Sequence, residues 1–149
     1  YAYDTVDAVL AADIDRLVLV IEKIQALQAF RANPEFEPLS IAFKRIDNIL
    51  KDFHGGSVDV NLLSQEAEIK LFANFENIGT RVEKGIAEKD FTAALNKLAA
   101  LRSPVDAFFD SVMVMDKDEK IRFNRLSLLA DISALFHQIA DFSKIVTAG

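Results

Sequence analysis

The sequence predicts an all-α protein, a single-domain helical bundle of about six to seven helices. Apolar residues recur every three or four positions through most of the 149 residues, which is the period of an α-helix. Only five glycines and three prolines are present, and this favours long helices over frequent tight turns. No segment keeps the strict alternation of a β-strand and no linker divides the chain, so residues 1–149 are expected to form one domain.

The N-terminal part is expected to contain two helices. Asp4 or Thr5 can cap a short first helix, and a second helix is predicted over residues 14–30. The second helix ends before Pro34, because the residue that precedes a proline avoids the helical region. The apolar stripe of the second helix consists of Leu17, Val20, Ile21, Ile24 and Leu27.

Most of the remaining helices have a recognisable start. A third helix is predicted over residues 38–53 and is ended by Gly55-Gly56. Ser64 is expected to cap a fourth helix that reaches about residue 86, and Asp90 to cap a short fifth helix that reaches about residue 101. The last two helices are expected to begin at Ser103-Pro104 and at Asp116 or Asp118, and to end near Val114 and Ile145.

The composition limits the possible functions. The chain has no cysteine, which excludes disulfides, thiolate zinc sites and a cysteine nucleophile. A formal net charge of −6 argues against general affinity for nucleic acids or anionic membranes, so any RNA contact must come from a local basic patch. No transmembrane-length apolar run and no signal peptide are recognisable. Because the first residue is Tyr1 rather than Met, the chain is expected to be a fragment of a longer protein.

No catalytic or metal-binding motif is recognisable. There is no phosphate-binding glycine loop, no His-Glu-x-x-His helix and no nucleophile elbow. His54 and His137 are far apart in sequence and are interpreted as turn or surface residues. The run Asp116-Lys117-Asp118-Glu119 lacks the ligand spacing of a calcium loop, and it fits a helix start, where acidic residues complement the helix dipole. We therefore predict no catalytic residue and no metal site.

The helix predicted over residues 38–53 has a basic side. At about 100° per residue, Lys44, Asn48 and Lys51 share one face, and Arg45 flanks it. Cations position phosphates and an amide can read a base edge, so these four residues form a candidate RNA-binding surface, the basic ridge. An ordinary solvated helix face has the same pattern, and both interpretations stay open.

Two arginines continue the apolar stripe of the last predicted helix. Arg125 and Arg122 lie in line with this stripe, and buried charges without partners are costly. Asp106 and Asp110 lie four residues apart on the preceding helix, where they repel each other unless a cation lies between them. The spacing favours a structural Asp–Arg cluster that joins the two helices. An arginine that faces RNA remains the alternative.

Several segments resemble one protein family. Residues 104–115, PVDAFFDSVMVM, resemble the signature near the C-terminus of bacterial glycyl-tRNA synthetase β subunits. Residues 122–129, RFNRLSLL, resemble the next helix of that family at the expected spacing. Residues 43–51, FKRIDNILK, are similar to its basic helix, and residues 3–9, YDTVDAV, also fit. The resemblance covers nearly the whole chain.

The resemblance implies an anticodon-binding domain of the DALR type, shared with arginyl-tRNA synthetases, within a longer β subunit. In this family an α subunit holds the class II catalytic core, which forms glycyl-adenylate from glycine and ATP with magnesium. The β subunit recognises glycine tRNA. We therefore expect a non-catalytic domain without a cofactor, part of a cytoplasmic α/β heterotetramer, with no membrane or DNA partner. The basic ridge, Arg122 and Arg125 are its expected RNA contacts.

Two other functional classes are considered. A helical protein-interaction or subunit-docking domain without RNA contact agrees with the acidity of the chain and its extensive helix surface. An enzyme or cofactor site in a four-helix bundle is disfavoured, because the sequence has no Glu-x-x-His pair and no clustered histidines. Titration with glycine tRNA at several salt concentrations would separate the docking domain from the RNA-binding domain.

Overall fold

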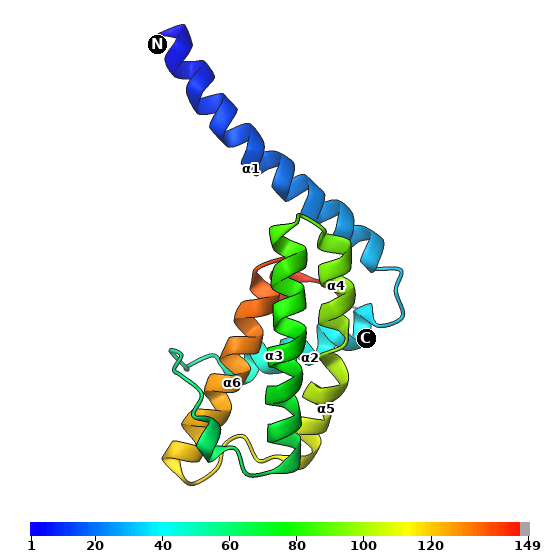
Figure 1. Ribbon diagram of the computed structural model, residues 1–149, viewed down its shortest axis with the longest axis vertical. Coiled ribbons are helices and arrows are strands. Elements are labelled where there is room, and N and C mark those ends of the chain that lie inside the picture. The colour runs from blue at the N-terminus through cyan, green and yellow to red at the C-terminus, as the bar shows by residue number, and fades with distance from the viewer. Residues whose placement is uncertain (147–149) are drawn as a thin grey trace.

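The computed structural model describes residues 1–146, in which helices predominate (Figure 1). The α-helices are α1 (Tyr3–Phe30), α2 (Phe36–Ile49), α3 (Glu66–Ala87), α4 (Phe91–Ala99), α5 (Arg102–Ser111) and α6 (Glu119–His137). Two short 3₁₀ helices, η1 (Val60–Leu62) and η2 (Phe142–Lys144), complete the secondary structure. The described residues contain no β-strand, and the predicted all-α class is confirmed.

The body of the bundle is built around α3. α4 and α5 pack along one side of α3 and α6 lies on the other, while α2 crosses behind them (Figure 1). An aromatic cluster joins α2 to the C-terminal part of the chain. The ring centroid of Phe43 lies 5.1 Å from that of Phe136 on α6 and 5.7 Å from that of Phe142 in η2. All three rings are buried, so their packing fixes α2 against α6 and η2.

Helix α1 differs from the prediction. It is one helix of 28 residues, so the two N-terminal helices expected from the sequence are continuous. Residues 3–30 contain neither glycine nor proline, and nothing interrupts the backbone hydrogen bonds. The C-terminal part packs on α4 and buries Ala26 and Phe30. The N-terminal part extends away from the bundle (Figure 1), and the predicted stripe is mostly exposed.

The next three helices begin close to their expected positions. α2 begins and ends slightly earlier than predicted. α3 begins after Gln65 rather than after Ser64, because the Gln65 N–H donates to the Glu68 carboxylate at 3.2 Å. Asp90 caps α4 as predicted and accepts a hydrogen bond from the Ala93 N–H at 3.1 Å.

The last two α-helices are shorter than predicted. α5 has Leu101 rather than the predicted serine at its N-cap, and it ends at Ser111 because Val112 is extended. Asp118 caps α6 through hydrogen bonds from two backbone N–H groups, which confirms one of the two predicted starts. α6 ends at His137, and η2 follows where a continuous helix was expected.

Candidate nucleic-acid interface

The basic ridge lies along α2 and the turn that follows it. Arg45, Asn48 and Lys51 are exposed, whereas Lys44 is half-buried. The guanidinium carbon of Arg45 lies 4.2 Å from the centroid of the Phe109 ring on α5. This cation–π contact holds the charge of Arg45 at the surface between α2 and α5. Three of the four predicted side chains are therefore accessible to a partner.

Lys44 has a structural contact within the chain. Its Nζ donates to the backbone carbonyl of Ile145 at 2.6 Å and so ties α2 to the segment that follows η2. A lysine ammonium has three donors, and this contact uses one of them. The side chain therefore contributes to the attachment of the C-terminal segment.

Arg125 lies at the centre of a buried ion-pair network. Its side chain is 2% exposed, and its Nε and Nη2 donate to the Glu68 carboxylate at 3.2 and 3.1 Å. Nη1 donates to the Met113 carbonyl at 2.6 Å and contacts the Asp116 carboxylate at 3.4 Å. The two-point contact with a carboxylate satisfies the planar guanidinium. Because Arg125 is buried, the RNA-facing role considered for it is wrong.

The expected pairing of Arg125 with Asp106 or Asp110 is also wrong. Asp106 instead contacts Arg102 at 3.5 Å, and Arg102 donates through Nε to Glu35 at 2.9 Å. The hydrogen bond with Glu35 is the main reason that the pKa of Arg102 is raised. Asp110 is exposed and forms no ion pair within residues 1–146. The arginine cluster therefore joins α6 to α3, not to α5.

Glu68 is the residue that the sequence interpretation missed. It is 1% exposed and supplies the carboxylate for Arg125. Its position in the first turn of α3 continues an apolar stripe, as the position of Arg125 does on α6. Opposite charges that interrupt two such stripes are the signal that could have found this pair. The stripe on α3 consists of Leu71, Phe75, Ile78 and Val82.

Arg122 borders a surface pocket of about 540 Å³ at the start of α6. Its Nη1 donates to the Asp116 carbonyl at 2.9 Å, which orients a half-buried guanidinium. Lys120 is exposed at the same pocket, and the Phe123 side chain is 47% exposed. Two cations and an exposed aromatic ring therefore meet there. The other lining residues are Phe53, Ser57, Asp59, Leu62, Glu119, Asn124 and Leu126.

The loop after α2 is held against α6 at this pocket. The Asn124 side chain accepts a hydrogen bond from the Asp59 N–H at 2.6 Å and donates to the Asp59 carbonyl at 3.0 Å. The rings of Phe53 and Phe123 meet edge to face, with centroids 5.5 Å apart. A Cβ atom at Gly56 would overlap the Phe123 ring, so the loop lies close because this residue has no side chain. These contacts fix the position of the exposed ring.

The two histidines belong neither to the ridge nor to the residues that line the pocket. His54 is exposed in the loop after α2, and the exposed His137 ring lies 5.4 Å from that of Phe43. Within residues 1–146, no group of three or more His, Cys, Asp or Glu side chains is placed to hold a metal ion. No helix in this part of the chain is long and apolar enough to cross a membrane.

A known protein family matches the part of the chain that carries the ridge and the pocket. Residues 39–147 match the family described as the DALR anticodon binding domain. The chain belongs to the DALR anticodon-binding domain family. The match extends from α2 to the C-terminal segment, so it includes the basic ridge and the Phe123 pocket, while α1 lies before it. The anticodon-binding domain expected from the sequence is confirmed at the level of the family.

Several relatives of this DALR domain share one description, the beta subunit of a glycine–tRNA ligase. The protein of this name from Syntrophus aciditrophicus (strain SB) is 52% identical over 147 residues, which cover 99% of this chain. Those from Geotalea daltonii and Geotalea uraniireducens are 45% and 46% identical, and each alignment covers 95% of this chain. The chain spans about a fifth of these relatives, 21% of each.

Proposed function

We propose that this chain recognises the anticodon region of glycine tRNA within the β subunit of an α/β glycine–tRNA ligase. The DALR match over residues 39–147 carries the proposal, and the descriptions of the relatives supply the amino acid. Because the chain spans 21% of those relatives, we assign the ligation of glycine, with ATP and magnesium, to other parts of a cytoplasmic enzyme. The class II catalytic core would lie in the α subunit of a heterotetramer, and this domain would contribute recognition alone.

The basic ridge and the cations at the pocket would contact phosphates. Arg45 and Lys51 are exposed on the ridge, and Lys120 is exposed at the pocket with Arg122 beside it. The Phe53–Phe123 contact joins the segment after α2, which begins at the ridge residue Lys51, to α6 at the pocket. Contacts to phosphates provide affinity and salt dependence without sequence information. The net charge of −6 would repel RNA from the rest of the surface.

The Phe123 pocket would hold an unpaired base. Anticodon bases are unpaired and can stack on an aromatic side chain, and such stacking contributes about 1–3 kcal/mol per base. The pocket volume of about 540 Å³ lies within the range of about 300–1,000 Å³ typical of small-ligand sites. On the ridge, the amide of Asn48 would pair with a base edge. The pocket and Asn48 would therefore contact bases, whereas the cations would contact phosphates whatever the RNA sequence.

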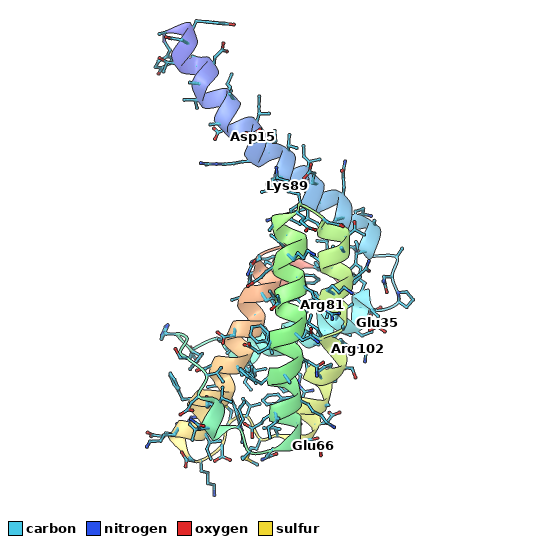
Figure 2. The ribbon with its side chains drawn as sticks, viewed as in Figure 1. Asp15, Glu35, Glu66, Arg81, Lys89 and Arg102 are labelled. Carbon is cyan, nitrogen blue, oxygen red and sulfur yellow. The ribbon has the colours of Figure 1, made fainter. Side chains whose placement is uncertain are left out.

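The experiment is a filter-binding titration of glycine tRNA with the intact ligase at several salt concentrations. Replacing Arg45 and Lys51 together by Ala should weaken binding and flatten the salt dependence by about one unit of slope per cation. Arg81→Ala is the control, because Arg81 is an exposed cation on α3 (Figure 2) that belongs neither to the ridge nor to the residues that line the pocket. Unchanged binding in the double variant would contradict the role of the ridge.

The pocket is tested in the same titration. Phe123→Ala should weaken binding by about 1–3 kcal/mol, because the ring on which a base would stack is lost. Asn48→Ala should reduce the discrimination between anticodon variants by about 1–3 kcal/mol if its amide makes a two-point base contact. If every variant binds glycine tRNA as tightly as the unaltered enzyme, the chain is a docking domain without RNA contact.

A further inference from the structure

The part of α1 from Val9 to Ile24 presents an apolar face that no described residue of the chain covers. Six side chains on this part of the helix are 50–59% exposed. At about 100° per residue, they fall within an arc of about 140°. In Figure 2 the side chains of the N-terminal part of α1 extend from the helix without a neighbouring element. The α1 apolar face consists of Val9, Leu10, Ile14, Leu17, Val20 and Ile24.

A different side of α1 already packs on the bundle. Ala26 and Phe30 are buried, and Leu19 packs against the core. Lys23 donates through Nζ to the Gln138 carbonyl at 2.9 Å and lies over the Phe91 ring at 5.5 Å from the centroid. The helix is therefore fixed to the bundle at its C-terminal end, and the α1 apolar face remains available to a second body.

The face has a shape that can receive side chains. A shallow hollow of about 420 Å³ is formed mainly by Leu10, Ile14, Leu17 and Val20. Asp13 and Arg16 also line it and form an exposed ion pair at 3.9 Å. An apolar centre with a charged margin is the usual composition of a protein–protein contact, and exposed apolar patches of this kind mark interaction sites.

The length of the relatives indicates what covers this face. The 52% identical relative aligns over 147 residues, yet these are 21% of its length. About four fifths of that relative therefore lies outside the aligned segment. α1 precedes the DALR match over residues 39–147, so it is not part of the matched domain. We propose that the α1 apolar face packs against another domain of the same β-subunit polypeptide. This proposal rests on the proposed function, because it places the chain within a β subunit.

Charge argues against a second copy of the chain as the occupant. Residues 1–16 contain four aspartates and one arginine, which gives −4 and +1 and a net charge of −3. Two α1 helices packed in parallel through this face would bring these acidic residues together, and such repulsion disfavours that pairing. A domain of the same polypeptide is instead present at a high effective concentration, which favours a contact of modest area.

Cysteine labelling in the full-length β subunit tests the proposal. Leu17→Cys lies on the α1 apolar face, and Ala11→Cys lies about 120° around the helix on exposed surface. In monomeric β subunit without its α partner, maleimide should label position 17 at least roughly tenfold more slowly than position 11, because burial must open before the thiol reacts. Labelling at each position is read from the mass of its peptide.

Other outcomes would overturn the proposal. Equal labelling of the two positions would mean that the face is uncovered. Protection that appears only at high protein concentration would assign the face to a second copy, and protection only after addition of the α subunit would assign it to that partner. As a second measurement, Leu17→Asp should lower the melting temperature of the β subunit, while Ala11→Asp should leave it unchanged. The tRNA titration of the same preparation shows separately whether the proposed function holds.

Discussion

The bundle buries charged side chains, whereas the part of α1 that extends from the bundle exposes apolar ones. Within the bundle, Arg125 and Glu68 are almost fully buried although both are charged. On α1, Leu17 and Ile24 are each 59% exposed although both are apolar. In both regions the neighbouring elements, and not the polarity of the residue, determine what is buried. A charge can be buried where a partner meets it with good geometry, and a leucine stays exposed where no element reaches it.

Arg125→Ala should have the largest effect on stability. It leaves the Glu68 carboxylate buried without its cation, and loss of one partner of a buried ion pair costs about 3–5 kcal/mol. Urea unfolding of the chain measures the loss, with Arg81→Ala as an exposed control on α3. A double variant, Arg125→Met with Glu68→Met, should lose less than Arg125→Ala alone. A double variant at least as unstable would refute the account of the pair.

Phe30→Ala and Leu17→Ala compare the two ends of α1 directly. Phe30 is 6% exposed, and its truncation should cost about 3 kcal/mol through lost packing. Leu17 is 59% exposed, so its truncation should change the stability of this chain by less than about 0.5 kcal/mol. The same urea unfolding serves both variants. Similar losses would show that the exposed part of α1 around Leu17 is packed in solution.

Arg102→Ala tests whether a partly exposed ion pair in the bundle contributes less stability than the buried pair of Arg125. The Arg102 side chain is 31% exposed while it contacts Glu35 and Asp106, and such a pair contributes at most about 1 kcal/mol. The loss of stability in Arg102→Ala should therefore be several-fold smaller than the loss in Arg125→Ala. A loss as large as that of the buried arginine would mean that exposure does not weaken the contact, and the distinction between the two arginines would fail.

Asp131 should show the smallest effect, and the effect should depend on pH. Burial, together with the charge of Glu76, raises the pKa of Asp131 above its ordinary value of 3.8. The folded state then binds the proton more tightly than the unfolded state, so ionisation of this carboxyl lowers stability as the pH rises through the folded pKa. Asp131→Asn should raise the melting temperature at neutral pH, and the gain should disappear near about pH 3, where both states bind the proton. A gain that is equal at both pH values would have another cause.

Local sequence patterns predicted part of this structure, and tertiary contacts determined the rest. The helical period gave the all-α class, and the caps at Asp90 and Asp118 lie where short-range chemistry places them. The exposure of α1 was not predictable, because an apolar stripe indicates which side of a helix can be buried but not whether a partner is present. The shortened end of α6 depends on the packing of Phe142, which brings the chain back onto α2.

The candidate interface, too, was only partly predictable from local sequence patterns. The basic ridge could be predicted because a single helix determines which of its residues share a face. The Phe123 pocket could not, because Phe53 and Phe123 come from segments that are far apart in the chain and meet only after folding. For Arg125 the need for a partner was predictable, but the choice of Glu68 over Asp106 depended on how α6 packs against α3.

Because Gly56 lies against the Phe123 ring, substitutions at these two positions should accompany each other in evolution. Any side chain at position 56 would meet the far end of the ring, and a ring on a rotatable side chain moves more readily than the backbone. A larger residue there would therefore reorient the ring and reshape the pocket while the bundle stays folded. Among relatives that keep an aromatic ring at position 123, glycine should persist at position 56, and a change at one position should accompany a change at the other.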